Sequence, residues 1–360
     1  MADEIRRFFP EDRAEIKVLP LADGGEGTAA LLFRYLGGKT EHITVRGPLG
    51  KAHRAWMGYN EADGTAYLEM ASAAGLELVP LQSRNPLVTT TYGVGELIRR
   101  AVDLGAKKLY IGMGGSATVD CGTGMAQALG ARFYDRSDRI IDASRGGGVL
   151  KDIKSMELSD MPQALQKMEI IALSDVRTLL KDCVKTFAPQ KGADTREHLD
   201  ILQQGVGNIY SLAQKAEGPD DFPGAGAAGG LGYGCRFFLK AAIKPGATVI
   251  FKLNSFKENA AWADYIITGE GTLDAQSFEG KTIGSLLAFL AGNNLHVPVV
   301  IICGQAKDLS LLRRQQNKYP FMVCPIINEL SQNNMEPAIA EENLRFNMAN
   351  LMHFIQNKVE

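Results

Sequence analysis

The stretch from Leu109 to Gly130, LYIGMGGSATVDCGTGMAQALG, constrains the fold more than any other part of the chain. Its apolar start predicts a buried strand, Gly114 and Gly115 allow a tight loop, and the residues after Gly122 predict a helix that ends at Gly130. A strand, a loop and a helix in this order form the building unit of an α/β protein. We therefore expect a parallel sheet with helices packed on it.

The loop in this stretch has the composition of an anion site. The amides at a helix start carry a partial positive charge, and the hydroxyl groups of Ser116 and Thr118 stand beside them in the sequence. A phosphate oxygen can bind at such a place without a dedicated cation. Alternatively, the glycines only turn the chain, and Thr118 or Asp120 caps the helix. Further loops of the same kind would favour phosphate binding.

Three further glycine-rich loops occur along the chain. One follows a strand expected at 15–21, the second spans Pro223–Gly232, and the third follows a strand expected at 265–268; their sequences are ADGGEGT, PGAGAAGGLG and GEGTLD. Loops at the carboxyl ends of parallel strands converge on one crevice. The second loop resembles the GxGxxG of dinucleotide-binding proteins. It lacks the preceding strand and an acidic residue about 20 positions further on, which disfavours a nicotinamide-dependent oxidoreductase.

Acidic residues accompany these loops and the neighbouring strand ends. They are Asp23, Glu26, Asp120, Asp175, Glu270 and Asp274. Carboxylate oxygens suit Mg²⁺, and glycine loops can hold phosphates, so together they describe a phosphoryl-transfer site. Each carboxylate taken alone could instead cap a helix or face solvent in a turn. The sequence does not separate a general base from a metal ligand.

The composition narrows the class of partner. Among 360 residues, 39 basic side chains stand against 41 acidic ones, so no global field favours nucleic acid or an anionic membrane, and we expect a small-molecule substrate. The five cysteines lie far apart without a CxxC spacing, which favours reduced thiols in the cytoplasm. No apolar run of about 18 residues or signal-peptide pattern occurs, so we expect neither export nor a membrane span.

The order of elements predicts two domains. A chain of 360 residues exceeds one ordinary core. Residues 1–42 and 246–360 are predicted to form a discontinuous Rossmann-like domain with a parallel sheet, because strands and helices alternate there. Residues 43–245 are predicted to form an inserted mixed α/β domain that begins with antiparallel strands. The sequence does not predict the oligomeric state.

Five segments carry a family resemblance. In chain order they read PLADGGEGT, GMGGSATVDCGTGMAQALGARF, FAPQKGA, PGAGAAGGLG and ITGEGTLDAQ. This series resembles the bacterial two-domain glycerate kinase family, the type that acts in glyoxylate and sugar-acid catabolism, from about residue 8 to the end. The resemblance implies ATP and Mg²⁺, D-glycerate as the acceptor, and a phosphoglycerate product, the 2-phospho isomer in most bacterial members. It also implies the discontinuous Rossmann-like domain with a second domain inserted.

The resemblance also suggests roles for individual residues. Nucleotide-binding residues would be Gly114, Gly115, Ser116, Thr118, Gly224, Gly226, Gly229, Gly230, Gly269 and Glu270. Asp23, Gly24, Gly25 and Glu26 would face the acceptor. Asp175 or Asp274 would serve as the base or a Mg²⁺ ligand, Asp120 as a further metal ligand, and Lys191 would neutralise developing charge.

The chain also departs from the family pattern. Family members typically open with another strand and an Asp-Ser-Phe-Lys loop, and the resemblance here starts after that segment, so an expected basic residue has no counterpart. The usual Asp-Val-(Asp/Asn)-Asn-Pro-Leu becomes Asp175-Val-Arg-Thr-Leu-Leu180, and Thr272 replaces a frequently basic residue. These departures favour one alternative, a catalytically impaired protein of the same family that binds a nucleotide or a sugar acid.

Overall fold

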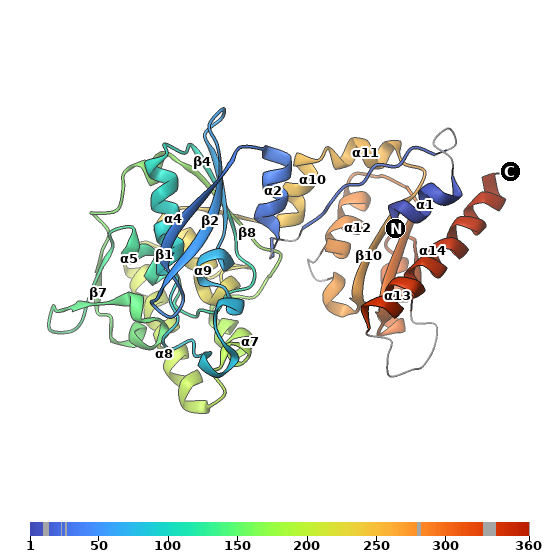
Figure 1. The fold of residues 1–360 in the computed structure, drawn as a ribbon. Coiled ribbons are helices and arrows are strands. Elements are labelled where there is room, and N and C mark those ends of the chain that lie inside the picture. The colour runs from blue at the N-terminus through green and yellow to red at the C-terminus, as the bar shows by residue number, and fades with distance from the viewer. Residues whose placement is uncertain (10–13, 23, 26, 279–281, 327–335, 360) are drawn as a thin grey trace. The chain divides into compact units, whose positions relative to one another are not determined.

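The computed structural model describes residues 1–9, 14–22, 24–25, 27–278, 282–326 and 336–359 (Figure 1). The chain divides into two compact units, Ala22–Ile250 and Met1–Leu21 with Phe251–Glu360. Both contain parallel strands with helices, which confirms the predicted α/β class.

The unit of residues 22–250 is built on a six-stranded sheet of order β1-β2-β3-β4-β8-β9. Its strands are β1 (Lys39–Arg46), β2 (Ala52–Asn60), β3 (Thr65–Glu69), β4 (Lys108–Gly112), β8 (Glu169–Leu173) and β9 (Ala242–Lys244). The first three strands pair antiparallel, and β3, β4, β8 and β9 pair parallel. The domain boundary predicted between residues 42 and 43 falls inside β1, which pairs with β2 along its whole length.

Helices and a small second sheet complete this unit. The helices are α2 (Thr28–Leu36), α3 (Ala71–Ala74), α4 (Tyr92–Asp103), α5 (Thr123–Ala128), α6 (Ala164–Lys167), α7 (Cys183–Phe187), α8 (Arg196–Lys215) and α9 (Ala227–Leu239). The small sheet holds β5 (Arg132–Tyr134), β6 (Ile140–Ile141) and β7 (Ser155–Glu157). The division between the units falls within α10 (Gly246–Leu253).

The central strands are buried, which explains why their sequences are continuous apolar runs. Every residue of β3 is buried, and so are the last four residues of β4. A strand in the middle of a parallel sheet is covered on both faces, so its sequence does not alternate between polar and apolar residues. Helix α4 instead buries Val94, Leu97, Ile98 and Ala101, the helical spacing that places them on one face.

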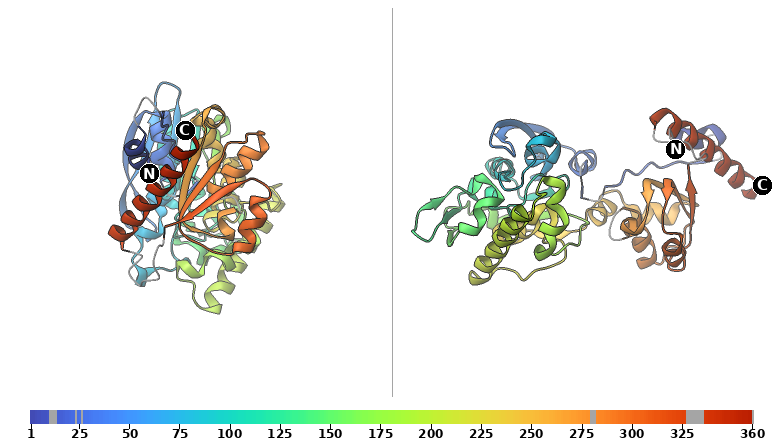
Figure 2. Two further views of the ribbon diagram at one scale, coloured as in Figure 1. Left: turned by 90° about the vertical axis from the view of Figure 1, so that its right-hand side faces the viewer. Right: turned by 90° about the horizontal axis from the view of Figure 1, so that it is seen from below.

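The other unit is built on three parallel strands, β10 (Ile266–Leu273), β11 (Val299–Ala306) and β12 (Phe321–Pro325). Its helices are α1 (Ala2–Phe8), α11 (Phe256–Trp262), α12 (Thr282–Gly292), α13 (Leu309–Gln316) and α14 (Pro337–Val359). Helix α14 packs Met348 and Leu351 against Val300 and Ile302 of β11. Helices α1 and α14 lie side by side although they come from opposite ends of the chain (Figure 2).

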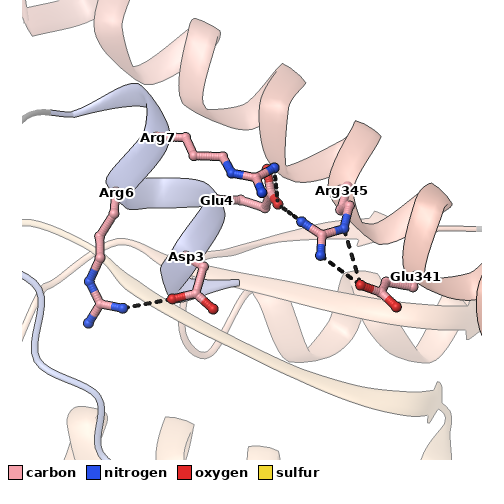
Figure 3. A network of polar contacts seen from close by, with 6 residues as sticks. All are labelled: Asp3, Glu4, Arg6, Arg7, Glu341 and Arg345. Atoms are coloured by element: carbon pink, nitrogen blue, oxygen red, sulfur yellow. Dashed lines mark hydrogen bonds and ion pairs between the residues drawn. The ribbon is translucent and has the colours of Figure 1, made fainter.

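A polar network joins these two terminal helices (Figure 3). Glu4, only 6% exposed, accepts hydrogen bonds from Arg7 at 2.9 Å and from Arg345 of α14. Arg345 also donates to Glu341 at 2.7 Å. A buried carboxylate is stabilised by such charged donors, so the network holds α1 on α14.

Two expected features of this unit are not observed. Residues 14–22 form no strand, because Pro20 has no amide to donate and Val18 is 54% exposed rather than packed. Strand β10 does not end at residue 268 but continues to Leu273, since β11 offers backbone partners as far as Ala306. Gly269 and Glu270 therefore lie in a strand and not in a loop.

Candidate active site

The candidate site lies at the carboxyl ends of three neighbouring parallel strands in the unit of residues 22–250. Glu69 of β3 pairs with Gly112 of β4, and Gly112 pairs with Leu173 of β8, so the three strands end level with one another. The loop with Gly114 and Gly115 leaves β4, and Ser174 and Asp175 leave β8. Ligands of open α/β sheets bind at this edge.

Gly24 joins these strand ends through its backbone. Its carbonyl oxygen accepts a hydrogen bond of 3.1 Å from the amide of Met113, directly after β4. Its φ is +88°, and a Cβ atom would lie 2.8 Å from the carbonyl carbon of Leu173. Only glycine fits there. The structure therefore brings the predicted acceptor loop, with half-buried Gly25, to the predicted nucleotide loop. Asp23 and Glu26 lie outside the described residues.

Glu69 is a residue of this edge that the sequence analysis missed. Its Oε1 accepts a hydrogen bond of 2.7 Å from the amide of Ala29 in the first turn of α2, and the side chain is buried. A carboxylate at a helix N-terminus satisfies an amide and interacts favourably with the helix dipole. Glu69 thus fixes the start of α2. The only signal in the sequence is an acidic residue that ends an apolar strand.

The loop after β4 is held by backbone hydrogen bonds. The carbonyl of Gly115 accepts from Leu76 at 2.7 Å, and the amide of Ala117 donates to Ala74 at 2.9 Å. Gly115 is exposed and Gly114 half-buried, whereas Ser116 and Thr118 are buried. Of these predicted nucleotide-binding residues, the two glycines are accessible and the two hydroxyl groups point into the protein.

Lys191 lies beneath this loop. Its Nζ donates to Ser116 Oγ at 2.5 Å and to the carbonyl of Thr118 at 2.8 Å, and the side chain is 3% exposed. Burial lowers its pKa from 10.5 to about 8, because an ammonium loses hydration inside the protein. The predicted direct contact with a transferring phosphoryl group gains no support from this geometry, since the ammonium is enclosed.

Asp120 is likewise enclosed. Its Oδ2 accepts from the amide and the hydroxyl of Thr91, both at 2.8 Å, and its Oδ1 accepts from the amide of Gly122 at 3.2 Å. Burial raises the pKa of this fully buried carboxyl, and the hydrogen bonds oppose that rise. The geometry gives no support to Asp120 as a Mg²⁺ ligand. Its visible function is to connect the starts of α4 and α5.

The start of α5 is not available to a phosphate. The amides of Gly122 and Met125 already donate to Asp120 and to Thr91 Oγ1. The anion site expected at this helix start is therefore occupied by the protein's own oxygen atoms. Thr91, which the sequence analysis did not single out, belongs to a run of three buried threonines before α4.

The loop with Gly224, Gly226, Gly229 and Gly230 packs against both neighbouring loops. The amide of Gly226 donates to Thr178 at 3.0 Å, and the carbonyl of Gly229 accepts from Cys121 at 3.2 Å. A Cβ atom on Gly229 would lie 1.9 Å from the carbonyl oxygen of Thr118. All four glycines are buried, and each lies against other atoms of the protein, either backbone or side chain. Their binding of a nucleotide stays a prediction.

Asp175 follows β8 at the same edge. The residue is half-buried, and its neighbour Ser174 donates its amide to Lys244 at 3.0 Å. Hydrogen bonds from Leu180 and Lys181 to Asp221 fix the end of this loop. Asp175 is thus a carboxylate presented on a loop that is held at both ends.

The remaining predicted residues belong to the other unit. Gly269 is exposed and Glu270 half-buried on β10. Asp274 follows this strand and accepts a hydrogen bond of 3.3 Å from the amide of Ser277, which starts a short helical turn. Within the described residues, no group of three or more His, Cys, Asp or Glu side chains could hold a metal ion.

Comparison with known proteins identifies the family of this chain. The model of the glycerate kinase family matches residues 1–356. The chain belongs to the glycerate kinase family. Glycerate kinase of Bacillus subtilis (strain 168) is 43% identical over 311 residues, which cover 84% of this chain and 80% of that protein. Glycerate 2-kinase of Escherichia coli (strain K12) is 39% identical over 309 residues, covering 84% and 79%.

A solved structure supports the same family. The crystal structure of a Salmonella typhimurium LT2 protein described as glycerate kinase 2 has a TM-score of 0.79 to this chain. It is 34% identical, and the match covers 99% of this chain and 94% of that one. The glycerate kinase family is a family of kinases, so the predicted enzyme class is confirmed. None of the described helices combines the length and the apolar character that a membrane span requires.

Proposed function

We propose that this member of the glycerate kinase family transfers the γ-phosphoryl group of ATP to D-glycerate and forms 2-phosphoglycerate in the cytoplasm. The proposal is supported by relatives named glycerate kinase and glycerate 2-kinase that match most of the chain. The free state of all five cysteines is compatible with a reducing compartment.

One observation carries the proposal for the site. The ends of β3, β4 and β8 bring together two glycine loops and one carboxylate, namely Gly24–Gly25, Gly114–Gly115 and Asp175. Phosphoryl transfer depends mainly on positioning and charge neutralisation, and accessible glycines let a phosphate approach backbone amides closely. We assign nucleotide phosphates to the loop after β4 and the acceptor to the loop before α2.

Asp175 has two candidate roles. As a general base it would accept the proton of the attacking glycerate hydroxyl, and as a metal ligand it would hold Mg²⁺. Mg²⁺ commonly takes one or two protein carboxylates and completes its coordination with phosphate and water oxygens, so a single loop carboxylate fits this ion. When bound, the ion would neutralise charge on the phosphates. Asp274 remains the second candidate for the base.

The proposal is tested with the full-length protein. Release of ADP is followed with ATP, Mg²⁺ and D-glycerate at millimolar concentrations, and omission of glycerate is the control. The product is identified with enolase, which dehydrates 2-phosphoglycerate directly and acts on 3-phosphoglycerate only after a mutase is added. Turnover without mutase supports the proposal.

Two other results would argue against it. Enolase activity that requires the mutase would assign the 3-phospho isomer and reject the product named here. Calorimetric binding of ATP or glycerate without ADP release would instead identify the impaired binding protein that the altered Asp175 loop suggests.

A further inference from the structure

Lys191 is the only lysine or arginine that is buried in the described part of the chain. An ammonium in the protein interior is costly unless hydrogen bonds replace its hydration. Here the Nζ atom has two such bonds, at 2.5 Å to Ser116 Oγ and at 2.8 Å to the carbonyl of Thr118. Both partners belong to the loop after β4. The ammonium group of Lys191 is therefore hydrogen-bonded to that loop.

The backbone of Lys191 is fixed from the opposite side. Its amide donates to Ala188 at 3.0 Å in the turn that follows α7. Gly192, at φ +96°, would place a Cβ atom 2.0 Å from the carbonyl oxygen of Arg84, so this turn packs tightly on a second segment. The lysine side chain thus connects a rigid turn to the loop that contains half-buried Gly114 and exposed Gly115.

Lys191 supplements the bonds from Leu76 and to Ala74 that hold the backbone of this loop. Thr118 Oγ1 is buried and has no hydrogen-bond partner in the described structure. The carbonyl of this residue is the point at which Lys191 binds. Without the ammonium, Ser116 Oγ and this carbonyl would both lose a charged donor. Such losses inside a protein favour a rearranged or mobile loop.

We propose that Lys191 is a positioning residue, which holds residues 114–118 in the shape that receives the nucleotide phosphates and does not itself touch the phosphoryl group. The inference rests on the proposed function only in assigning the phosphates to this loop. The anchoring itself is a property of the unliganded protein and can be measured without turnover.

The first test is hydrogen exchange of the full-length protein without ligands. The variants are Lys191→Met, Lys191→Arg and, as a matched control, Lys185→Met. Lys185 lies exposed on α7, and its side chain makes no hydrogen bond or ion pair with the described residues. We expect the peptide spanning residues 113–121 to exchange at least about ten-fold faster in Lys191→Met, less so in Lys191→Arg, and unchanged in the control. Unchanged exchange in a folded Lys191→Met protein would overturn the proposal.

Ser116→Ala provides a second variant should Lys191→Met not fold. It removes one of the two hydrogen bonds and leaves the lysine in place. We expect a smaller acceleration in the same peptide and none in peptides of β10–β12. Equal exchange of residues 113–121 in this variant and the native protein would contradict the anchoring function.

The second test separates positioning from direct catalysis. We expect Lys191→Met to raise KM for ATP by about ten-fold or more while KM for glycerate changes less than about two-fold, with partial rescue by Lys191→Arg. A fall in kcat with unchanged KM for ATP and unchanged exchange would show direct contact with the phosphoryl group and reject the inference. If the native protein shows no kinase activity, the proposed function fails, and the exchange experiment still decides whether Lys191 anchors the loop.

Discussion

Replacement of Gly229 by alanine tests whether this glycine is needed for packing of the protein or for binding of the nucleotide. The residue has φ +68°, and a Cβ atom would lie 1.9 Å from the carbonyl oxygen of Thr118. A left-handed conformation costs an alanine about 1–2 kcal/mol. The new methyl group would push the backbones of residues 229 and 118 apart, which adds about 1–3 kcal/mol. Loss of the hydrogen bond from the Cys121 amide adds about 1 kcal/mol. We expect Gly229→Ala to lower the free energy of unfolding by about 4 kcal/mol.

Gly207→Ala is the matched control. Gly207 lies on an exposed position of α8, and a Cβ atom there would meet nothing within 4 Å. Alanine is the better helix former, so this change should leave stability unchanged or raise it by up to about 1 kcal/mol.

Urea unfolding followed by tryptophan fluorescence provides the measurement. The chain has two tryptophans, Trp56 on β2 and Trp262 on α11. In a Trp262→Phe background, Trp56 reports the unit of residues 22–250 alone. With a slope of about 2–3 kcal/mol per molar urea, the midpoint should fall by more than about 1 M. An unchanged midpoint together with a raised KM for ATP would refute the packing argument and support direct binding of phosphate at Gly229.

Four further predictions follow from residues already described. Because burial lowers the pKa of Lys191 from 10.5 to about 8, the unfolded chain binds more protons than the folded one between these values, and stability should rise with pH by up to about 3 kcal/mol. Urea titrations at pH 8 and pH 10 should show a smaller rise in the free energy of unfolding for Lys191→Met than for the native protein. An identical pH dependence of the two proteins would contradict this prediction. Glu69→Ala should cost about 1–2 kcal/mol in the same unfolding assay through loss of the bond to Ala29, and an equal effect of Glu77→Ala, an exposed control, would argue against capping of α2. Asp175→Asn should lower kcat at least about 100-fold, with Asp220→Asn as the exposed control, and retained turnover would remove Asp175 from the mechanism. Glu4→Ala should lower the thermal midpoint of the unit built from both chain ends more than Asp3→Ala does, because Glu4 is buried between Arg7 and Arg345 whereas Asp3 is exposed.

The sequence predicts well what depends on local pattern. The strand that ends before Gly114, its glycine loop and the family resemblance lead to the α/β class, which the structure confirms, and to the sheet edge at which we propose the site. Apolar runs mark central parallel strands because both faces are covered, as in β3 and β4. The prediction for residues 14–22 was wrong because their apolar residues suggest a strand, whereas Pro20 lacks an amide hydrogen and Val18 is exposed.

What the sequence does not reveal is the partner of a buried polar group. Asp120 stands in a loop with the composition of a metal site, and only the structure shows that Thr91, distant in sequence, donates two hydrogen bonds to its Oδ2. Lys191 is similar, since its contacts with Ser116 and Thr118 cross more than 70 residues of chain. The sequence also does not reveal why Gly229 has to be a glycine. A glycine that lets a phosphate approach and a glycine that packs against the backbone of another segment look the same in a sequence.

The packing of α1 against α14 has a consequence for synthesis on the ribosome. Helix α1 is synthesised well before α14, the helix that it contacts. The continuous segment 22–250 can fold while translation proceeds, whereas Glu4 has to wait for Arg345 to emerge. Until then the apolar face of the first helix, with Ile5 and Phe8, is uncovered and offers a binding surface to chaperones.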